Sequence, residues 1–340
     1  MHNLKEKKLI VSEDCKIVDA IKKINSSNIK ILFVINKKKK LTGSVSSGDI
    51  RRSIRKKIDP KNKIHTIMCK KPKFIYKDSE KKFSKDYLIS VPVVNKRKEI
   101  IKFYFSKGTR SQKENTIFLM AGGKGKRLLP LTKKTPKPLL KIKGIPIIEK
   151  IIKDFRSQGY VNFVISVNYL ANKIIKYLGN GKKLKVNISY IVEKNYLGTA
   201  GSLSLLNIKN THFPMIVANS DLISEIDYTN LINYHEKKKA NLTVCAKNKI
   251  FEMPYGEIVL NNNLVKKIVE KPVSYHLVNA GIYVINQSVI KNLTKNKKLM
   301  MNILITGLLK KNKNVLSYPI YEKWLDIGNK ADFLKINKNI

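Results

Sequence analysis

From residue 116 onward, short apolar runs alternate with amphipathic stretches, and this alternation constrains the fold more than any other feature of the chain. The apolar runs have the length of strands, as in 116–122 (TIFLMAG) and 162–168 (NFVISVN). Between them, apolar residues recur with helical spacing in 146–158, the pattern of an amphipathic helix. Alternating strands and helices favour a mostly parallel sheet with helices on both faces. We therefore expect an α/β fold.

The same pattern predicts the order of the remaining elements. Further strands are expected at 187–193 and 213–221, and further helices at 171–178, 199–206 and 227–238. From residue 242 onward strand-like runs dominate. This predicts an antiparallel insertion beside the main sheet, followed by a helical C-terminus.

The first 106 residues form a separate module that is approximately duplicated. The order strand, helix, strand, strand, helix starts at residue 10, and a shorter second copy starts near residue 64. A small α/β unit of this kind needs its twin to cover its sheet. Residues 107–115 are polar and lack periodicity, which is typical of a linker. We expect one domain at 1–106 and a second at 116–340.

The net charge of +45 says less about the class of binding partner than its size suggests. Only seven of the 69 basic residues are arginines, and the lysines are spread over the whole of the 340-residue chain. Arginine is the preferred reader of base edges and phosphates. General surface charge is therefore favoured over a nucleic-acid footprint, and we expect no specific nucleic-acid partner. Polyanionic ligands such as nucleoside triphosphates would still be attracted.

Several protein classes are excluded by what the sequence lacks. No apolar run approaches the ~20 residues of a membrane-spanning helix, and the N-terminus has no secretory signal pattern. The three cysteines (Cys15, Cys69 and Cys245) are far apart, which excludes a disulfide framework and a Cys-x-x-Cys zinc site. We expect a cytoplasmic protein with no membrane partner.

A glycine-rich turn follows the strand at 116–122. Gly122, Gly123 and Gly125 lie in GGKGKR, where free backbone N–H groups can cradle an anion. The turn lacks the Gly-Lys-Ser/Thr of a Walker A loop and the third glycine of a dinucleotide fingerprint. Taken alone, it is equally well explained as a plain tight turn.

The longer string 118–142 (FLMAGGKGKRLLPLTKKTPKPLLKI) resembles the signature of the sugar-1-phosphate nucleotidyltransferases. The family's Leu-x-Ala-Gly-Gly-x-Gly-Thr-Arg-Leu-x-Pro-Leu-Thr and Pro-Lys-Pro-Leu are kept, with Lys126 in place of Thr. Further matches are YIVEKNYLGTAGSL (190–203), VANSDLI (217–223), VEKP (269–272) and WLDIGNKADFLKIN (324–337). Ser220 replaces a glycine of the family. The resemblance covers about 116–338 and implies a Rossmann-like, GT-A-like domain.

The resemblance also implies the roles of individual residues. Those expected to bind the nucleotide are Ala121, Gly122, Gly123, Lys124, Gly125, Glu193, Gly198 and Thr199. Those expected to bind the sugar phosphate are Gly256, Glu270, Lys271 and Asn279. Arg127 would grip the triphosphate, and Lys137 would neutralise charge at the α-phosphate.

A magnesium site is expected at Asp221 and Asp326, which lie in matched motifs at strand ends. Nucleotidyl transfer is an in-line displacement in which positioning and charge neutralisation dominate. Mg²⁺ takes few carboxylates together with phosphate oxygens. The alternative for both residues is a helix cap or a turn.

The N-terminal module resembles a pair of CBS domains, which commonly bind adenine nucleotides between two copies. The match is best in LTGSVSSGDIRRSI (41–54), where Ser46 would bind a phosphate and Asp49 a ribose. The second copy has no equivalent Ser/Thr-x-x-Asp. The alternatives are a helix cap at Asp49 and a structural or dimerising role for the module, and the chain is expected to be capable of forming a homo-oligomer.

Together these features predict an enzyme that makes an NDP-sugar and pyrophosphate from a nucleoside triphosphate and a sugar 1-phosphate. A CBS pair ahead of a domain of this kind resembles the guanylyltransferases of surface-glycan and nonulosonic-acid precursor synthesis. This resemblance implies GTP as the substrate, with UTP or dTTP as alternatives. A second hypothesis is a nucleotide-sensing regulatory subunit with an inactive transferase domain. A third is nucleic-acid binding through the net charge, which would depend steeply on salt.

Overall fold

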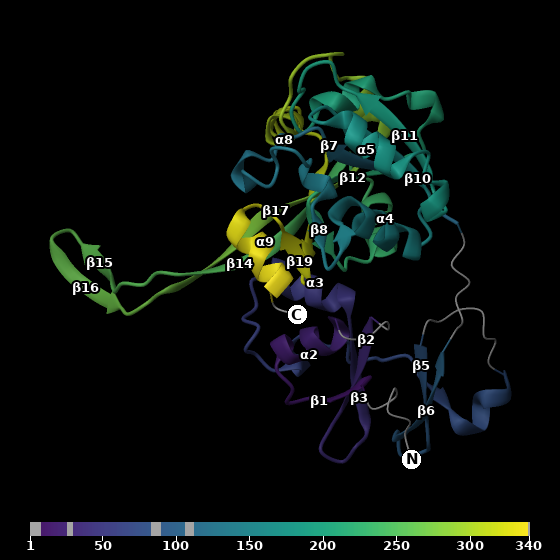
Figure 1. Cartoon of the computed structure of the whole chain (residues 1–340). Coiled ribbons are helices and arrows are strands. Elements are labelled where there is room, and N and C mark those ends of the chain that lie inside the picture. The colour runs from purple at the N-terminus through teal and green to yellow at the C-terminus, as the bar shows by residue number, and fades with distance from the viewer. Residues whose placement is uncertain (1–7, 26–29, 83–89, 106–111, 339–340) are drawn as a thin grey trace. The chain divides into compact units, whose positions relative to one another are not determined.

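The computed structural model describes residues 8–25, 30–82, 90–105 and 112–338 (Figure 1). The chain forms two compact units, Met1–Thr109 and Arg110–Ile340. Each unit has its own buried core. No described helix is long and apolar enough to cross a membrane.

The first unit contains two small sheets with the same topology. In one, β1 (Ile10–Ser12) is parallel to β2 (Ile31–Ile35), which is antiparallel to β3 (Leu41–Ser46). In the other, β4 (Ile75–Tyr76), β5 (Ser90–Val94) and β6 (Ile100–Phe105) pair in the same order and directions. The helical segments of this unit are α2 (Ile17–Asn25), α3 (Ser47–Arg55), η1 (Ile64–Thr66) and η2 (Lys77–Lys82).

The turns between β2 and β3 and between β5 and β6 contain equivalent hydrogen bonds. The Asn36 Oδ1 atom accepts from the backbone N–H groups of Lys38 and Lys40 at 3.0 Å each. The Asn95 Oδ1 atom accepts from those of Arg97 and Glu99 at 2.9 Å each. The halves share one core, in which the Phe33 and Phe103 rings lie 5.4 Å apart.

The second unit is built on a seven-stranded sheet in the order β11-β10-β7-β12-β17-β14-β18 (Figure 1). Its strands are β7 (Ile117–Ala121), β10 (Asn162–Val167), β11 (Asn187–Val192), β12 (Met215–Asn219), β14 (Leu242–Glu252), β17 (Val273–Ile285) and β18 (Val315–Ile320). All neighbours are parallel except β17, which is antiparallel to both β12 and β14. The α/β, mostly parallel fold expected from the sequence is confirmed. The expected insertion differs in one respect, because β14 and β17 belong to the main sheet itself.

Helices cover both faces of this sheet. One core cluster contains buried residues of α4 (Ile147–Ser157), α5 (Ala171–Leu178) and α6 (Tyr228–Lys237). The other contains residues of α7 (Gln287–Lys291) and α8 (Met301–Lys310). The chain continues to α9 (Lys330–Lys338).

The segment expected as a helix at 199–206 forms only a 3₁₀ helix, η6 (Gly201–Leu205). The backbone N–H groups of Ala200 and Gly201 both donate to the Leu299 carbonyl, at 2.9 and 3.1 Å. These hydrogen bonds hold the start of the segment against the loop at Leu299. The spacing of apolar residues in the segment therefore does not determine which type of helix forms.

Short elements complete the unit. They are β8 (Lys141–Ile142), β9 (Ile145–Pro146), β13 (Leu222–Ser224), β15 (Glu257–Asn261), β16 (Leu264–Val269), β19 (Trp324–Asp326), η3 (Lys126–Leu128), η4 (Lys137–Leu139), η5 (Lys182–Leu184) and η7 (Ile208–Asn210). The outer parts of β14 and β17 run past the edge of the sheet and carry the β15–β16 hairpin (Figure 1). We call residues 248–277 the arm.

Candidate active site

A cleft of about 640 Å³ opens at the carboxyl ends of β7 and β12. Ligands of open α/β sheets bind at this edge. Its lining includes all eight expected nucleotide-binding residues together with Arg127, Lys137 and Asp221. A second cavity, of about 740 Å³ between α4 and α5, contains none of the expected residues. The first cleft is therefore the candidate active site.

The glycines of the turn differ in what surrounds them. A Cβ on Gly122 would lie 2.8 Å from Glu193 Oε1, and Gly125 has φ +61° with Thr132 Cγ2 at 3.0 Å from its would-be Cβ. Both positions therefore require glycine. Gly123 has no neighbour within 4 Å of such an atom. The turn leads into the short 3₁₀ helix η3 and not into an α-helix, so any anion cradle here consists of the loop's own N–H groups.

Lys137 and Asp221, which both line the cleft, form an ion pair. The Lys137 ammonium contacts Asp221 Oδ2, and the two side chains are 11 % and 20 % exposed. Lys137 is the first residue of η4 and lies between Pro136 and Pro138. The residues on either side of η4, Pro136 and Leu140, have extended backbone conformations. Asp221 Oδ1 is buried and accepts no hydrogen bond among the described residues. This carboxylate oxygen is thus buried without a hydrogen bond from the described part of the chain. Such an oxygen lowers the stability of the fold unless a bound ligand interacts with it.

Asp326 lies beside this pair. β13 and β19 are antiparallel, and the Ile327 N–H donates to the Asp221 carbonyl at 3.2 Å. Partial desolvation raises the pKa of Asp326, and the neighbouring Asp221 carboxylate raises it further, while Lys137 and Arg127 act in the opposite direction. Two coupled carboxylates with an unsatisfied oxygen fit a divalent cation that prefers oxygen ligands. No group of three or more His, Cys, Asp or Glu side chains suited to a metal occurs in the described part of the chain.

Glu193 holds the loop that forms another wall of the cleft. Its Oε1 accepts from the Ser166 hydroxyl, and its Oε2 accepts from the Leu197 N–H at 2.8 Å. The Thr199 hydroxyl accepts from the Met301 N–H at 2.8 Å. Both side chains are therefore occupied by protein partners. Both residues line the cleft together with Gly198.

The sequence reasoning did not single out Tyr196 and Asn219, which also line the cleft. Tyr196 is 41 % exposed, and the signal available in the sequence was an aromatic residue within the matched motif at 190–203. Asn219 precedes the Ser220-Asp221 motif directly.

The family models agree with this arrangement. A model described as "Nucleotidyl transferase" matches residues 117–340, and a model described as "CBS domain" matches residues 4–56. The first match covers well over half of the chain. The chain belongs to the nucleotidyl transferase family.

Relatives of this nucleotidyl transferase carry a common name. "Mannose-1-phosphate guanyltransferase" from Pichia angusta is 34 % identical over 224 residues, which are 64 % of this chain and 61 % of that protein. "Putative mannose-1-phosphate guanyltransferase" from Sulfolobus acidocaldarius is 31 % identical over 228 residues, 65 % of this chain and 62 % of that protein. The chain therefore spans less than two thirds of the length of these relatives.

Solved structures share the fold of the second unit. HddC from Yersinia pseudotuberculosis superimposes with a TM-score of 0.53 at 24 % identity, over 66 % of this chain and 99 % of that one. A putative glucose-1-phosphate thymidylyltransferase from Bacillus anthracis gives 0.52 at 23 % identity, over 67 % and 94 %. At these identities the likeness shows the fold alone.

The structure does not bring all expected site residues of this nucleotidyl transferase to the cleft. Gly256, Glu270 and Lys271 lie on the arm, are exposed and are not part of the cleft lining. Asn279 lies nearer the sheet, where its amide donates to the Tyr283 hydroxyl and accepts from the Gly281 N–H, at 2.8 and 2.9 Å. Asp326 is not in the lining either, although Gly328, two residues further along the chain, is.

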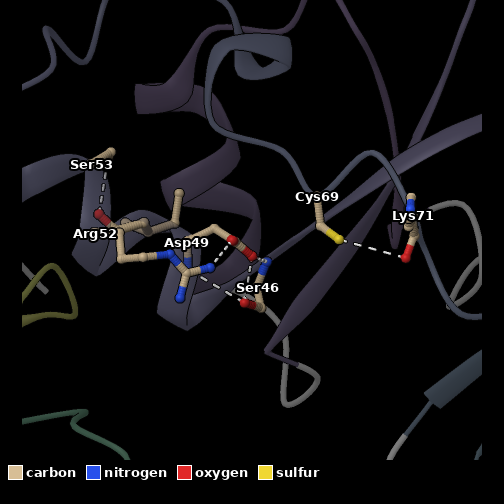
Figure 2. A network of polar contacts seen from close by, with 7 residues as sticks. Ser46, Asp49, Arg52, Ser53, Cys69 and Lys71 are labelled. Carbon is tan, nitrogen blue, oxygen red and sulfur yellow. Dashed lines mark hydrogen bonds and ion pairs between the residues drawn. The ribbon is translucent and has the colours of Figure 1, made fainter.

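Figure 2 shows that Ser46 and Asp49 in the CBS module are bonded to each other. Asp49 Oδ2 accepts from the Ser46 backbone N–H at 2.8 Å and from its hydroxyl at 2.6 Å, and the two residues form a capping box at the start of α3. Asp49 Oδ1 accepts from Arg52. The helix-cap alternative thus accounts for both side chains, and the adenine-nucleotide site stays a prediction.

Proposed function

We propose that this protein is a Mg²⁺-dependent sugar-1-phosphate guanylyltransferase that makes a GDP-sugar and pyrophosphate. The observation that carries the proposal is one cleft that is lined by both the glycine turn and the Lys137–Asp221 ion pair. Asp326 lies on the strand that pairs with β13, and β13 starts directly after Asp221. Charge neutralisation and positioning are what nucleotidyl transfer requires of a protein.

The magnesium ion would be held by Asp221 and Asp326 together with phosphate oxygens of the substrate. The unsatisfied Asp221 Oδ1 supports this assignment. When bound, Mg²⁺ neutralises charge on the triphosphate.

The chain's own residues bind and orient the two substrates. The N–H groups of the glycine turn and the exposed Arg127 side chain take the β- and γ-phosphates, and Lys137 stabilises the charge that builds up at the α-phosphate. A phosphate oxygen of the sugar 1-phosphate forms a bond to the α-phosphorus. The bond to the bridging oxygen breaks, and pyrophosphate leaves with the electron pair.

The choice of GTP rests on the relatives. Those compared above are named mannose-1-phosphate guanyltransferases at 31–34 % identity, and the HddC structure has also been determined in complex with GMP-PN. The loop at Glu193–Thr199, which includes the exposed Tyr196, lines the cleft and would contact the base. A hexose or aminosugar 1-phosphate would be the acceptor, bound by Glu270, Lys271 and Asn279, and the product would serve glycan precursor synthesis.

The test is pyrophosphate release with Mg²⁺, crossing GTP, UTP, dTTP, CTP and ATP with the 1-phosphates of mannose, glucose, glucosamine and N-acetylglucosamine. We expect release with GTP and one sugar phosphate. Release with UTP or dTTP alone would overturn the choice of base. Nucleotide binding by calorimetry without turnover on any pair would favour a regulatory subunit.

A further inference from the structure

Among the described residues, no further strand pairs with β14 or β17 along the arm. β18 pairs with β14 only up to Lys247, and β12 pairs with β17 only from Ile282 to Ile285. From Asn248 and Leu277 outward, β14 and β17 pair with each other alone. A two-stranded ribbon is at best marginally stable in water by itself, so the arm needs a covering surface.

The arm also carries most of the molecule's exposed large apolar side chains. Among the described residues, 13 of the 23 large hydrophobic residues that are at least 37 % exposed lie within 250–277. The exposed fraction reaches 74 % for Tyr255 and 75 % for Leu264. Exposed apolar side chains that are scattered singly are normal on a soluble protein, whereas a concentration of them such as this one marks an interaction site.

Both faces of the arm are apolar. Ile250 and Phe251 are adjacent in sequence, as are Ile258, Val259 and Leu260, and all are exposed. Successive residues of a strand point to opposite faces, and strands that are apolar on both faces are typical of sheets covered on both sides. A partner that only touched one face would leave the other in water.

The arm separates residues that the proposed function needs together. Val273 lies six residues beyond Asn279 along β17, about 20 Å at 3.3 Å per residue, and Lys271 lies further out. A lysine side chain spans only a fraction of that distance. In this structure the cleft of a chain and its own Lys271 are therefore apart.

We propose that two copies of this chain exchange arms, so that the arm of each copy packs on its partner and Lys271 completes the partner's cleft. The role of Lys271 rests on the proposed function. A reciprocal exchange of this kind gives a closed two-fold dimer. It covers both faces of each ribbon and brings the cationic Lys271 to the cleft that contains Asp221 and binds anionic substrates.

The decisive experiment is complementation between two inactive variants, Asp221→Ala and Lys271→Ala, co-expressed with different tags. If arms are exchanged, random pairing makes half of the dimers mixed, with one intact cleft in each, so about a quarter of wild-type activity returns. If each arm serves its own cleft, no site contains both residues and activity stays at background. That second result, with both variants folded and dimeric, overturns the proposal.

The assay also separates this proposal from the proposed function. Wild-type enzyme without activity, or a Lys271→Ala variant with full activity, contradicts the assigned chemistry and not the exchange. The exchange then remains testable by light scattering in ~0.3 M salt, where repulsion between the basic chains is screened. Wild type should have the mass of two chains, and Tyr255→Ser/Leu264→Asn the mass of one.

The matched control is Leu309→Asn, which replaces an exposed leucine on α8 (54 % exposed) and should leave the dimer intact. Circular dichroism should show all variants folded. A monomeric wild type, including one that instead binds lipid vesicles, or a dimer that survives the arm substitutions unchanged, overturns the exchange.

Discussion

The two carboxylate oxygens of Asp221 have different surroundings in the cleft. One of its carboxylate oxygens contacts Lys137, and the other is buried without a hydrogen-bond partner among the described residues. A carboxylate placed in this way contributes little to the free energy of unfolding. The free-energy cost of removing two charges from water offsets most of the attraction between them. Its position is better explained by ligand binding than by folding.

We expect Asp221→Ala to lower kcat at least about 100-fold, the scale seen when one electrostatic contact to a transition state is lost. The variant should remain folded, with the free energy of unfolding reduced by about 1–3 kcal/mol because Lys137 is left without its partner. Steady-state kinetics and urea unfolding measure the two effects. Asp19→Ala, on the exposed face of α2, is the control and should change neither. An active Asp221→Ala enzyme would remove this residue from the site.

Asp154 on α4 gives a prediction about pH. Desolvation raises its pKa to about 7, and Glu225 adds to the shift while a hydrogen bond with Gln158 opposes it. Because the folded-state pKa lies above the ordinary value of 3.8, the folded state binds more protons than the unfolded state between these two values. The free energy of unfolding should therefore fall as pH rises from about 4 to about 7.

The substitution Asp154→Asn should remove most of this fall, which we put at about 1–3 kcal/mol after discounting for partial exposure. Urea unfolding at pH 5 and pH 7 of wild type and variant measures it. Equal pH dependence in the two proteins would contradict the raised pKa.

At the scale of elements, the glycine turn shows that neighbouring glycines can serve different purposes. Gly122 makes room for the Glu193 carboxylate, which in turn accepts a hydrogen bond from the Leu197 N–H in the loop that follows. Gly123 faces open space in the cleft. One glycine thus belongs to the packing of the protein and the other to the space available for a ligand.

This difference predicts opposite outcomes for two alanine variants. Gly122→Ala should destabilise the protein by about 1–3 kcal/mol, because the new Cβ overlaps Glu193. Gly123→Ala should leave the free energy of unfolding within about 0.5 kcal/mol of wild type and weaken triphosphate binding several-fold, because its methyl group narrows the cleft. Thermal unfolding and calorimetric titration with GTP distinguish the two. Equal stability losses would refute the assignment.

For the whole molecule, we expect the charge of +45 to act mainly on the encounter with an anionic substrate. A strongly basic surface raises the local concentration of anions, and salt weakens this effect because the Debye length is ~10 Å at 0.1 M. We expect the KM for the triphosphate to rise several-fold between 50 and 300 mM KCl with little change in kcat. The check is a salt series at fixed Mg²⁺. A kcat that falls while KM stays constant would place the effect in the chemical step.

Local patterns predicted much of the second unit. The strand at 116–122, the helix at 146–158 and the strand at 162–168 appear within one or two residues of their expected bounds. The helix buries one stripe of apolar residues and the strands are buried on both faces. The pattern of apolar residues along the sequence therefore predicts them directly. The 3₁₀ helix η6 and the place of β14 and β17 in the main sheet were not predictable in this way, because both depend on pairing with distant segments.

The sequence by itself determined the residue types of the site and their order, because the motifs around the glycine turn, Lys137, Asp221 and Asp326 are each local and long enough to be specific. Only the tertiary structure decided which of them meet. It brings Lys137 and Asp221 into contact across 84 positions, bonds Ser46 to Asp49 as a helix cap, and leaves Lys271 on the arm, away from its own cleft. The physical reason is that a side chain's partners are set by how sheets and loops pack, and spacing along the chain does not encode that packing.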